Sequence, residues 1–172
     1  MTVLAAIVGT IVLLTILWDG FEVIILPRRV ARKLRLSRLF YLSTWTIWSW
    51  LALHVCSTKR RERYLSFYGP LSLLFLIMVW AALMMVAFAM VQWSVGPPHM
   101  SFLESMYLSG TTFITLGMGV PHTRMARAVL IVEAGTGFGF LALVISYLPV
   151  LYQSFAKRET SILLLDARAG SP

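Results

Sequence analysis

Hydroxyl side chains and closely spaced glycines gather in one stretch of the chain, TTFITLGMGV, which runs from residue 111 to residue 120. Gly117 and Gly119 can take a positive φ without steric penalty. A backbone that alternates in sense points successive carbonyl oxygens the same way. Those oxygens and the Thr115 hydroxyl would form a ladder of oxygen cages if several chains met at one axis. Oxygen cages suit hard cations such as potassium and sodium, so the stretch predicts cation binding.

A short helix is predicted immediately before this stretch. Ser101 and Glu104 have the spacing of a capping box, in which each side chain bonds the backbone amide of the other residue. A helix over residues 102–113 would be about 18 Å long, too short to cross a hydrocarbon core of about 30 Å. We therefore expect it to enter the membrane, stop and return, with the negative end of its dipole favouring a cation.

The composition of the chain is that of an integral membrane protein. Of its 172 residues, 59% are hydrophobic and only 13% are charged, whereas soluble domains have about 25% charged residues. The net charge of +8 does not indicate nucleic-acid binding, because most of the basic residues lie in two short clusters beside apolar segments. The single cysteine, Cys56, excludes an intrachain disulfide.

Three apolar runs are long enough to cross a bilayer: Thr2–Leu26, Leu71–Val95 and Met125–Phe155. A fourth, Leu39–Cys56, has a basic cluster on each side. If it crossed the membrane, one of the clusters would lie outside, against the positive-inside rule. We therefore expect an interfacial helix on the cytoplasmic leaflet, with a true span as the alternative. This topology predicts an N-terminus outside the cell and a cytoplasmic C-terminus.

The order of these segments resembles the pore domain of tetrameric potassium channels, over residues 70–158. That family has an outer helix, a re-entrant pore helix, a T-x-G-x-G filter and a long inner helix, and the bacterial two-helix type is the most similar in kind. Leu116-Gly-Met-Gly119 stands where the family has Val-Gly-Tyr-Gly, after a threonine-rich approach. The resemblance implies a homotetramer around one water-filled pore.

The resemblance also implies which residues would act. The ion-binding filter would consist of Thr115, Leu116, Gly117, Met118 and Gly119, with K⁺ or Na⁺ bound at the first four. Glu133 stands four residues before Gly137, which would be the gating hinge of the inner helix. Close helix packing by Gly135 and Gly139 is the competing interpretation of this glycine-rich segment. Glu104 and Glu133 would support the filter.

Two departures from the family pattern affect selectivity. Met118 replaces the filter aromatic and has no hydroxyl for the pore helix, and Val120 replaces the acidic residue that often follows the filter. The sequence therefore leaves three hypotheses. They are a potassium-channel-like pore, a weakly selective or non-selective monovalent cation channel, and a non-conducting membrane scaffold with a degenerate pore.

Two acidic residues in the first apolar run, Asp19 and Glu22, lie three positions apart and so share one helix face. Acids inside a membrane suggest a proton or cation relay. Structural pairing with Arg28, Arg29 or the surface helix is the interpretation that we favour.

The sequence thus predicts an all-α membrane protein in the cell (inner) membrane. It would comprise an N-terminal transmembrane helix, basic loop and interfacial helix (1–69), a pore domain (70–158) and a cytoplasmic tail (159–172). Its partners would be three copies of itself, membrane lipid and permeant monovalent cations, with no nucleic acid and no cofactor. The sequence has no nucleophile–base pair, phosphate loop or metal motif in a solvent-accessible segment, so we do not expect an enzyme.

Overall fold

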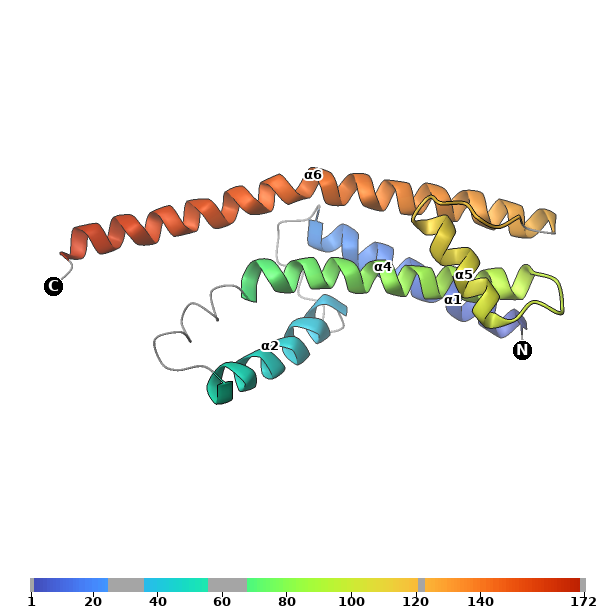
Figure 1. Cartoon of the computed structure of the whole chain (residues 1–172), viewed down its shortest axis with the longest axis horizontal. Helices are drawn as coiled ribbons and strands as arrows, with labels where there is room; N and C mark the ends of the chain where they lie inside the picture. The colour runs from blue at the N-terminus through green and yellow to red at the C-terminus, as the bar shows by residue number, and fades with distance from the viewer. Residues whose placement is uncertain (1, 25–35, 56–67, 121–122, 171–172) are drawn as a thin grey trace.

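A computed structural model describes residues 2–24, 36–55, 68–120 and 123–170 of the chain. Five helices make up this part: α1 Thr2–Ile24, α2 Leu36–Val55, α4 Tyr68–Val95, α5 Phe102–Phe113 and α6 Arg124–Ala169 (Figure 1). None of the described residues lies in a strand. The predicted all-α fold is confirmed.

Three of these helices are long and apolar enough to cross a membrane, over Val3–Val23, Leu71–Val95 and Arg124–Pro149. They belong to α1, α4 and α6, which are the three spans that the sequence predicts. Helix α2 is not among them, although it has 20 residues. The number of candidate spans in the described part therefore agrees with the prediction.

Helix α1 runs antiparallel to α4 and packs closely along it (Figure 1). Gly9 allows this approach, because a Cβ atom at that position would lie 2.7 Å from the carbonyl oxygen of Ala87. Further along, Ile16 joins Trp80 and Met84 of α4 in the buried core. A small residue at the crossing is how membrane helices commonly bring their backbones together.

Helix α5 occupies the residues predicted for the re-entrant helix and packs between α4 and α6 (Figure 1). Both bonds of the capping box at its start are present. Glu104 N donates to Ser101 Oγ at 3.2 Å, and Ser101 N donates to Glu104 Oε2 at 2.8 Å. Phe113, the last residue of α5, belongs to the same buried core as Trp80.

Helix α6 is longer than the sequence suggests. The apolar run was expected to end at Phe155, before Lys157 and Arg158, but the helix continues to Ala169 and has 46 residues. The two charged residues end the apolar pattern but do not break a helix, and the helix ends only before Gly170, whose φ is 65°. Pro149 lies inside α6, where it removes one backbone hydrogen bond.

Asp19 connects α1 to α2 and α4. Its Oδ2 accepts hydrogen bonds from Ser37 N at 3.1 Å and from Trp80 Nε1 at 3.2 Å, and its Oδ1 accepts from Ser37 Oγ at 3.2 Å. Ser37 lies in the first turn of α2, where backbone amides have no partner inside the helix. The carboxylate therefore holds the start of α2, which agrees with the expected contact to the surface helix.

Glu22 lies on the same face of α1 and is also buried. It accepts a hydrogen bond from Trp18 Nε1 at 2.8 Å. The predicted alternative partners, Arg28 and Arg29, lie outside the described residues, as do both basic clusters apart from Arg38.

Candidate functional site

The chain reverses direction immediately after α5. Leu116 N and Gly117 N both donate to the carbonyl oxygen of Thr111, at 2.8 and 3.2 Å, and Thr115 N donates to that of Thr112 at 2.9 Å. The amides of the reversal thus occupy carbonyls at the end of α5, which would otherwise lack partners. Within the described part of the chain, the carbonyl oxygens of residues 115–118 accept no hydrogen bond, so they are available to another partner.

Two residues of this segment have left-handed backbone conformations. Thr115 has a φ of 66° and Gly117 a φ of 60°. For Thr115 this conformation costs on the order of 1–3 kcal/mol, because its side chain crowds the backbone. Residues 115 and 117 therefore supply the alternation of backbone sense that the sequence predicts.

Gly119 differs from its expectation. Its φ is not positive, so backbone freedom is not the reason for a glycine here. A Cβ atom at Gly119 would collide with Cδ1 of Leu108 on α5. The absence of a side chain lets the end of the filter segment, which we define as residues 115–119, lie directly against α5.

Apolar side chains of the filter segment and its continuation face outward from the single chain. Leu116 is 64% exposed, Met118 69% and Val120 79%. Met118 was expected to lack a hydrogen bond to the pore helix. The structure shows one in which Met118 is the acceptor. Tyr107 Oη of α5 lies 3.7 Å from the Met118 sulfur and can donate to it. Sulfur is a weak acceptor, so this support is slight.

Glu133 lies behind the re-entrant helix and is fully buried. The Ser109 hydroxyl of α5 is hydrogen-bonded to Glu133 Oε1 and to the carbonyl oxygen of Met85 on α4, the latter at 2.7 Å. Three helices therefore meet at one polar point. Glu104, the other expected support, bonds the backbone at the start of α5 and lines one pocket together with Gly119, at the end of the filter segment.

Gly137, the expected hinge, contacts the end of α5. A Cβ atom there would collide with the carbonyl oxygen of Phe113. Helix α6 continues through this position without interruption. Gly135 and Gly139, expected to pack closely, have no atom of the described chain within 4 Å of such a Cβ atom. Close packing is therefore observed at Gly137, and the hinge remains a prediction.

Sequence reasoning missed several polar residues around the filter segment. Ser109, Gln92 and Tyr107 received no role, although a lone amide such as Gln92 inside an apolar run is a recognisable signal, since intramembrane polar groups tend to be functional. Thr123 was also missed. It caps α6 by accepting from Ala126 N at 3.1 Å, and its hydroxyl donates to the carbonyl oxygen of Val95 at 3.0 Å.

Comparison with known families bears on this arrangement. Residues 70–153 match the family model described as "Ion channel". The matched segment contains the outer helix α4, the re-entrant helix α5, the filter segment and the part of α6 that can span a membrane. No curated protein and no solved structure matched the chain. Residues 70–153 are therefore similar to an ion channel domain, in a chain with three candidate membrane spans among its described residues.

Proposed function

We propose that the chain assembles as a homotetramer that conducts monovalent cations, with K⁺ as its principal ion, through a filter formed by residues 115–119. Carbonyl oxygens of Thr115, Leu116, Gly117 and Met118 would bind the ions, together with the Thr115 hydroxyl. The observation that carries this proposal is the row of carbonyls without hydrogen bonds, in a segment where Thr115 and Gly117 alternate in backbone sense.

The surroundings of the filter segment support the same function. A capped helix of 12 residues precedes it, and α6 follows it. The C-terminal end of α5, which carries partial negative charge, lies where the segment begins. Non-helical backbone at membrane depth is tolerated where it lines a water-filled path. A tetramer would supply that path, because each chain contributes one filter segment.

One observation favours a second candidate, a weakly selective cation channel. The Met118 side chain is mostly exposed in the chain, and its hydrogen bond within the described residues is the weak contact with Tyr107. A filter held this loosely would fix its oxygen spacing less strictly. Whether selectivity depends on spacing or on the number and field of the carbonyls is debated, so measurement must separate the two candidates.

We further propose that the protein lies in the cell membrane with its N-terminus outside and its C-terminus in the cytoplasm. The start of α1 and the re-entrant helix α5 lie at one end of the molecule, and the end of α6 lies at the other (Figure 1). In the sequence, both basic clusters lie between α1 and α4, whereas α5 follows the other end of α4. Basic connections favour the cytoplasmic side, so the filter would open outward.

The test is a reversal potential recorded from purified protein in planar bilayers, with potassium on one side and sodium on the other. The proposal predicts a potential near the potassium equilibrium value. A potential near zero with clear current would instead support the weakly selective channel. Absence of current under voltage, pH and lipid changes would support the non-conducting scaffold, and would contradict the proposal.

A further inference from the structure

Ser109 of α5 makes two hydrogen bonds that cannot both use its own proton. Its hydroxyl oxygen lies 2.7 Å from the carbonyl oxygen of Met85 on α4, and it is also hydrogen-bonded to Glu133 Oε1 of α6. A serine hydroxyl carries one hydrogen and can also accept, whereas a backbone carbonyl only accepts. One of the two bonds therefore needs a hydrogen that Ser109 does not supply.

Only one assignment gives both bonds a hydrogen. Ser109 donates to the Met85 carbonyl, and Glu133 donates to Ser109. The second bond requires a protonated carboxyl, because an ionised carboxylate only accepts. If Glu133 were ionised, Ser109 would donate to it. The Ser109 and Met85 oxygens would then face each other at 2.7 Å with no hydrogen between them.

The surroundings of Glu133 favour the neutral acid for a second reason. Its side chain has no exposed surface, and it lies in the part of α6 that can span a membrane. Among the described residues, the polar groups that face it are uncharged: the Ser109 hydroxyl from α5 and the Gln92 amide from α4. An ionised carboxylate buried among uncharged groups costs far more than a neutral acid.

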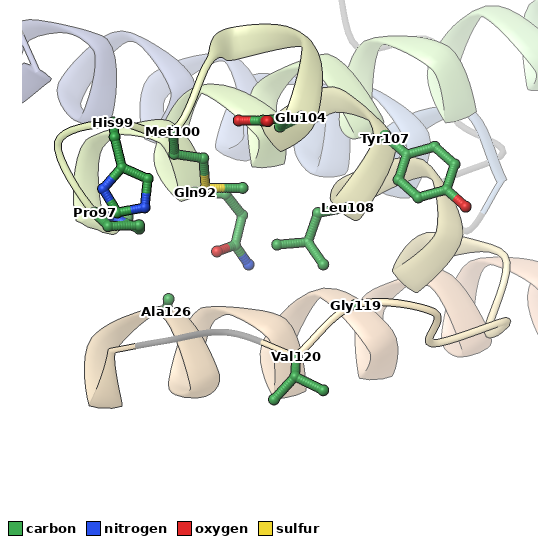
Figure 2. Close-up of a pocket in the computed structure, with 11 residues that line it drawn as sticks. Gln92, Pro97, His99, Met100, Glu104, Tyr107, Leu108, Gly119, Val120 and Ala126 are labelled. Atoms are coloured by element: carbon green, nitrogen blue, oxygen red, sulfur yellow. The ribbon is translucent and has the colours of Figure 1, made fainter.

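Gln92 faces the same carboxyl. Its side chain is buried and is directed into the space between α4 and α6, where it lines the pocket drawn in Figure 2. The Gln92 amide lies beside Glu133, and its Nε2 can donate to the carboxyl oxygen that does not contact Ser109. A protonated Glu133 would thus accept with one oxygen and donate with the other.

We propose that Glu133 is a neutral carboxylic acid that positions the re-entrant helix by donating a hydrogen bond to Ser109. The bonds join α6 to α5 and α5 to α4 in sequence. Ser109 stands about one turn before Phe113, the last residue of α5, so this connection lies close to the reversal that begins the filter segment. Glu133 is therefore a positioning residue that acts through a hydrogen bond and not through charge. Its neutral state does not depend on conduction.

Infrared difference spectra of the full chain at neutral pH test the proposal. The protein is kept in a maltoside detergent, whose molecules have no carbonyl group. A protonated carboxyl has a C=O stretch above the amide and carboxylate bands, and the band shifts when H₂O is replaced by D₂O. Subtracting the Glu133→Gln spectrum from that of the wild type should leave one such band. Glu104→Gln, the same change at an exposed carboxylate that accepts from a backbone amide, should leave none.

A second pair of variants changes the band without replacing Glu133. Ser109→Ala removes the acceptor of the proposed bond, so the acid band should persist and move to higher wavenumber. Ser105→Ala is the matched control, because Ser105 is also a buried serine of α5 but bonds the carbonyl oxygen of Ser101. Its spectrum should keep the band in the wild-type position.

The effect on ion flux rests on the proposed function. Glu133→Gln keeps an uncharged side chain whose amide can donate to Ser109, so its potassium flux should match that of the wild type. Glu133→Leu has no donor, and its flux should fall by about fivefold, which corresponds to the loss of one typical hydrogen bond. A residue that acted through its charge would lose flux equally in both variants.

Three outcomes would overturn the proposal. They are no acid band in the difference between the wild type and Glu133→Gln, an unmoved band in Ser109→Ala, and equal loss of flux in Glu133→Gln and Glu133→Leu. The comparison with Ser109→Ala needs no change at Glu133, so it holds even where Glu133 cannot be replaced. An acid band that moves as expected, in a protein that passes no current, would retain this proposal and reject the proposed function.

Discussion

Thr115 and Gly117 determine the course of the filter backbone, because both have a φ in the left-handed region. Only one of the two is a glycine. The strain at Thr115 persists because the reversal is tied to α5 through the Thr111 and Thr112 carbonyls. A threonine at such a position also places a hydroxyl beside the row of carbonyls. If Thr115 binds ions as proposed, strain and function would coincide at this residue.

Gly117→Ala should disable the filter. An alanine at a φ of 60° costs roughly 1–2 kcal/mol more than glycine, because Cβ approaches the carbonyl oxygen. That cost shifts the ratio of filter conformations by a factor of about 5–30. We expect potassium flux into vesicles to fall by a similar factor.

The matched control is Gly20→Ala, in α1, where the nearest atom to a new Cβ is 4.0 Å away. Its flux should equal that of the wild type, and both variants should unfold near the wild-type temperature. Unchanged flux in Gly117→Ala would show that ions do not pass along this backbone.

The residue scale is also where sequence reasoning was least complete. A positive φ was expected at Gly119 and not at Thr115, since propensity assigns such angles to glycine, whereas the tertiary contact of Gly119 with Leu108 decides its conformation. The meeting of Ser109 and Glu133 depends on how three helices pack. The capping box at Ser101 could be predicted, because both of its bonds lie within four residues.

The first and last residues of a helix were predicted well where the residues that start or end the helix lie close by in the sequence. The bounds of α5 agree with the sequence, because the capping box starts the helix and the glycine-containing reversal ends it. The end of α6 could not be predicted from hydropathy, since the charged residues after Phe155 change polarity without interrupting the helix. Hydropathy thus identified the spans but not the full length of this helix.

The docking of α2 is an element-scale property that depends on Asp19. Asp19→Asn replaces one carboxylate oxygen by an NH₂ group, which cannot accept a hydrogen bond from Ser37 or Trp80. The buried groups left unpaired should lower the free energy of unfolding by about 1–3 kcal/mol. We also expect faster amide exchange throughout α2, measured by hydrogen–deuterium exchange mass spectrometry.

Ser43→Ala provides the comparison for Asp19→Asn. The Ser43 hydroxyl bonds carbonyls of its own helix and is exposed, so its loss should leave exchange in α2 unchanged. If Asp19→Asn left α2 as protected as in the wild type, the carboxylate would not hold this helix. Docking would then depend on other contacts, such as that between Thr44 and Tyr68.

At the scale of the whole molecule, the proposed function requires more than one chain for a complete conduction path. It has one filter segment, whose carbonyls lack partners within the described chain. Apolar side chains of that segment and of the first part of α6 are largely exposed, among them Leu116, Met118 and Ile131. Closed symmetric assembly would bring such surfaces together, which agrees with the proposed homotetramer.

Mixing wild-type and Gly117→Ala chains tests the number of subunits in one conducting unit. If four chains assemble at random and one altered filter segment impairs the whole pore, equal amounts should leave roughly one sixteenth of the flux difference between the wild type and Gly117→Ala. The chains would be co-expressed with different tags, and their ratio would be measured in each vesicle preparation. A fall to one half would mean that each chain conducts alone, and a fall to about one quarter would indicate a dimer. Co-expression with Gly20→Ala should leave the full flux, because its filter segment is intact, so any loss in the test mixture reports the shared pore.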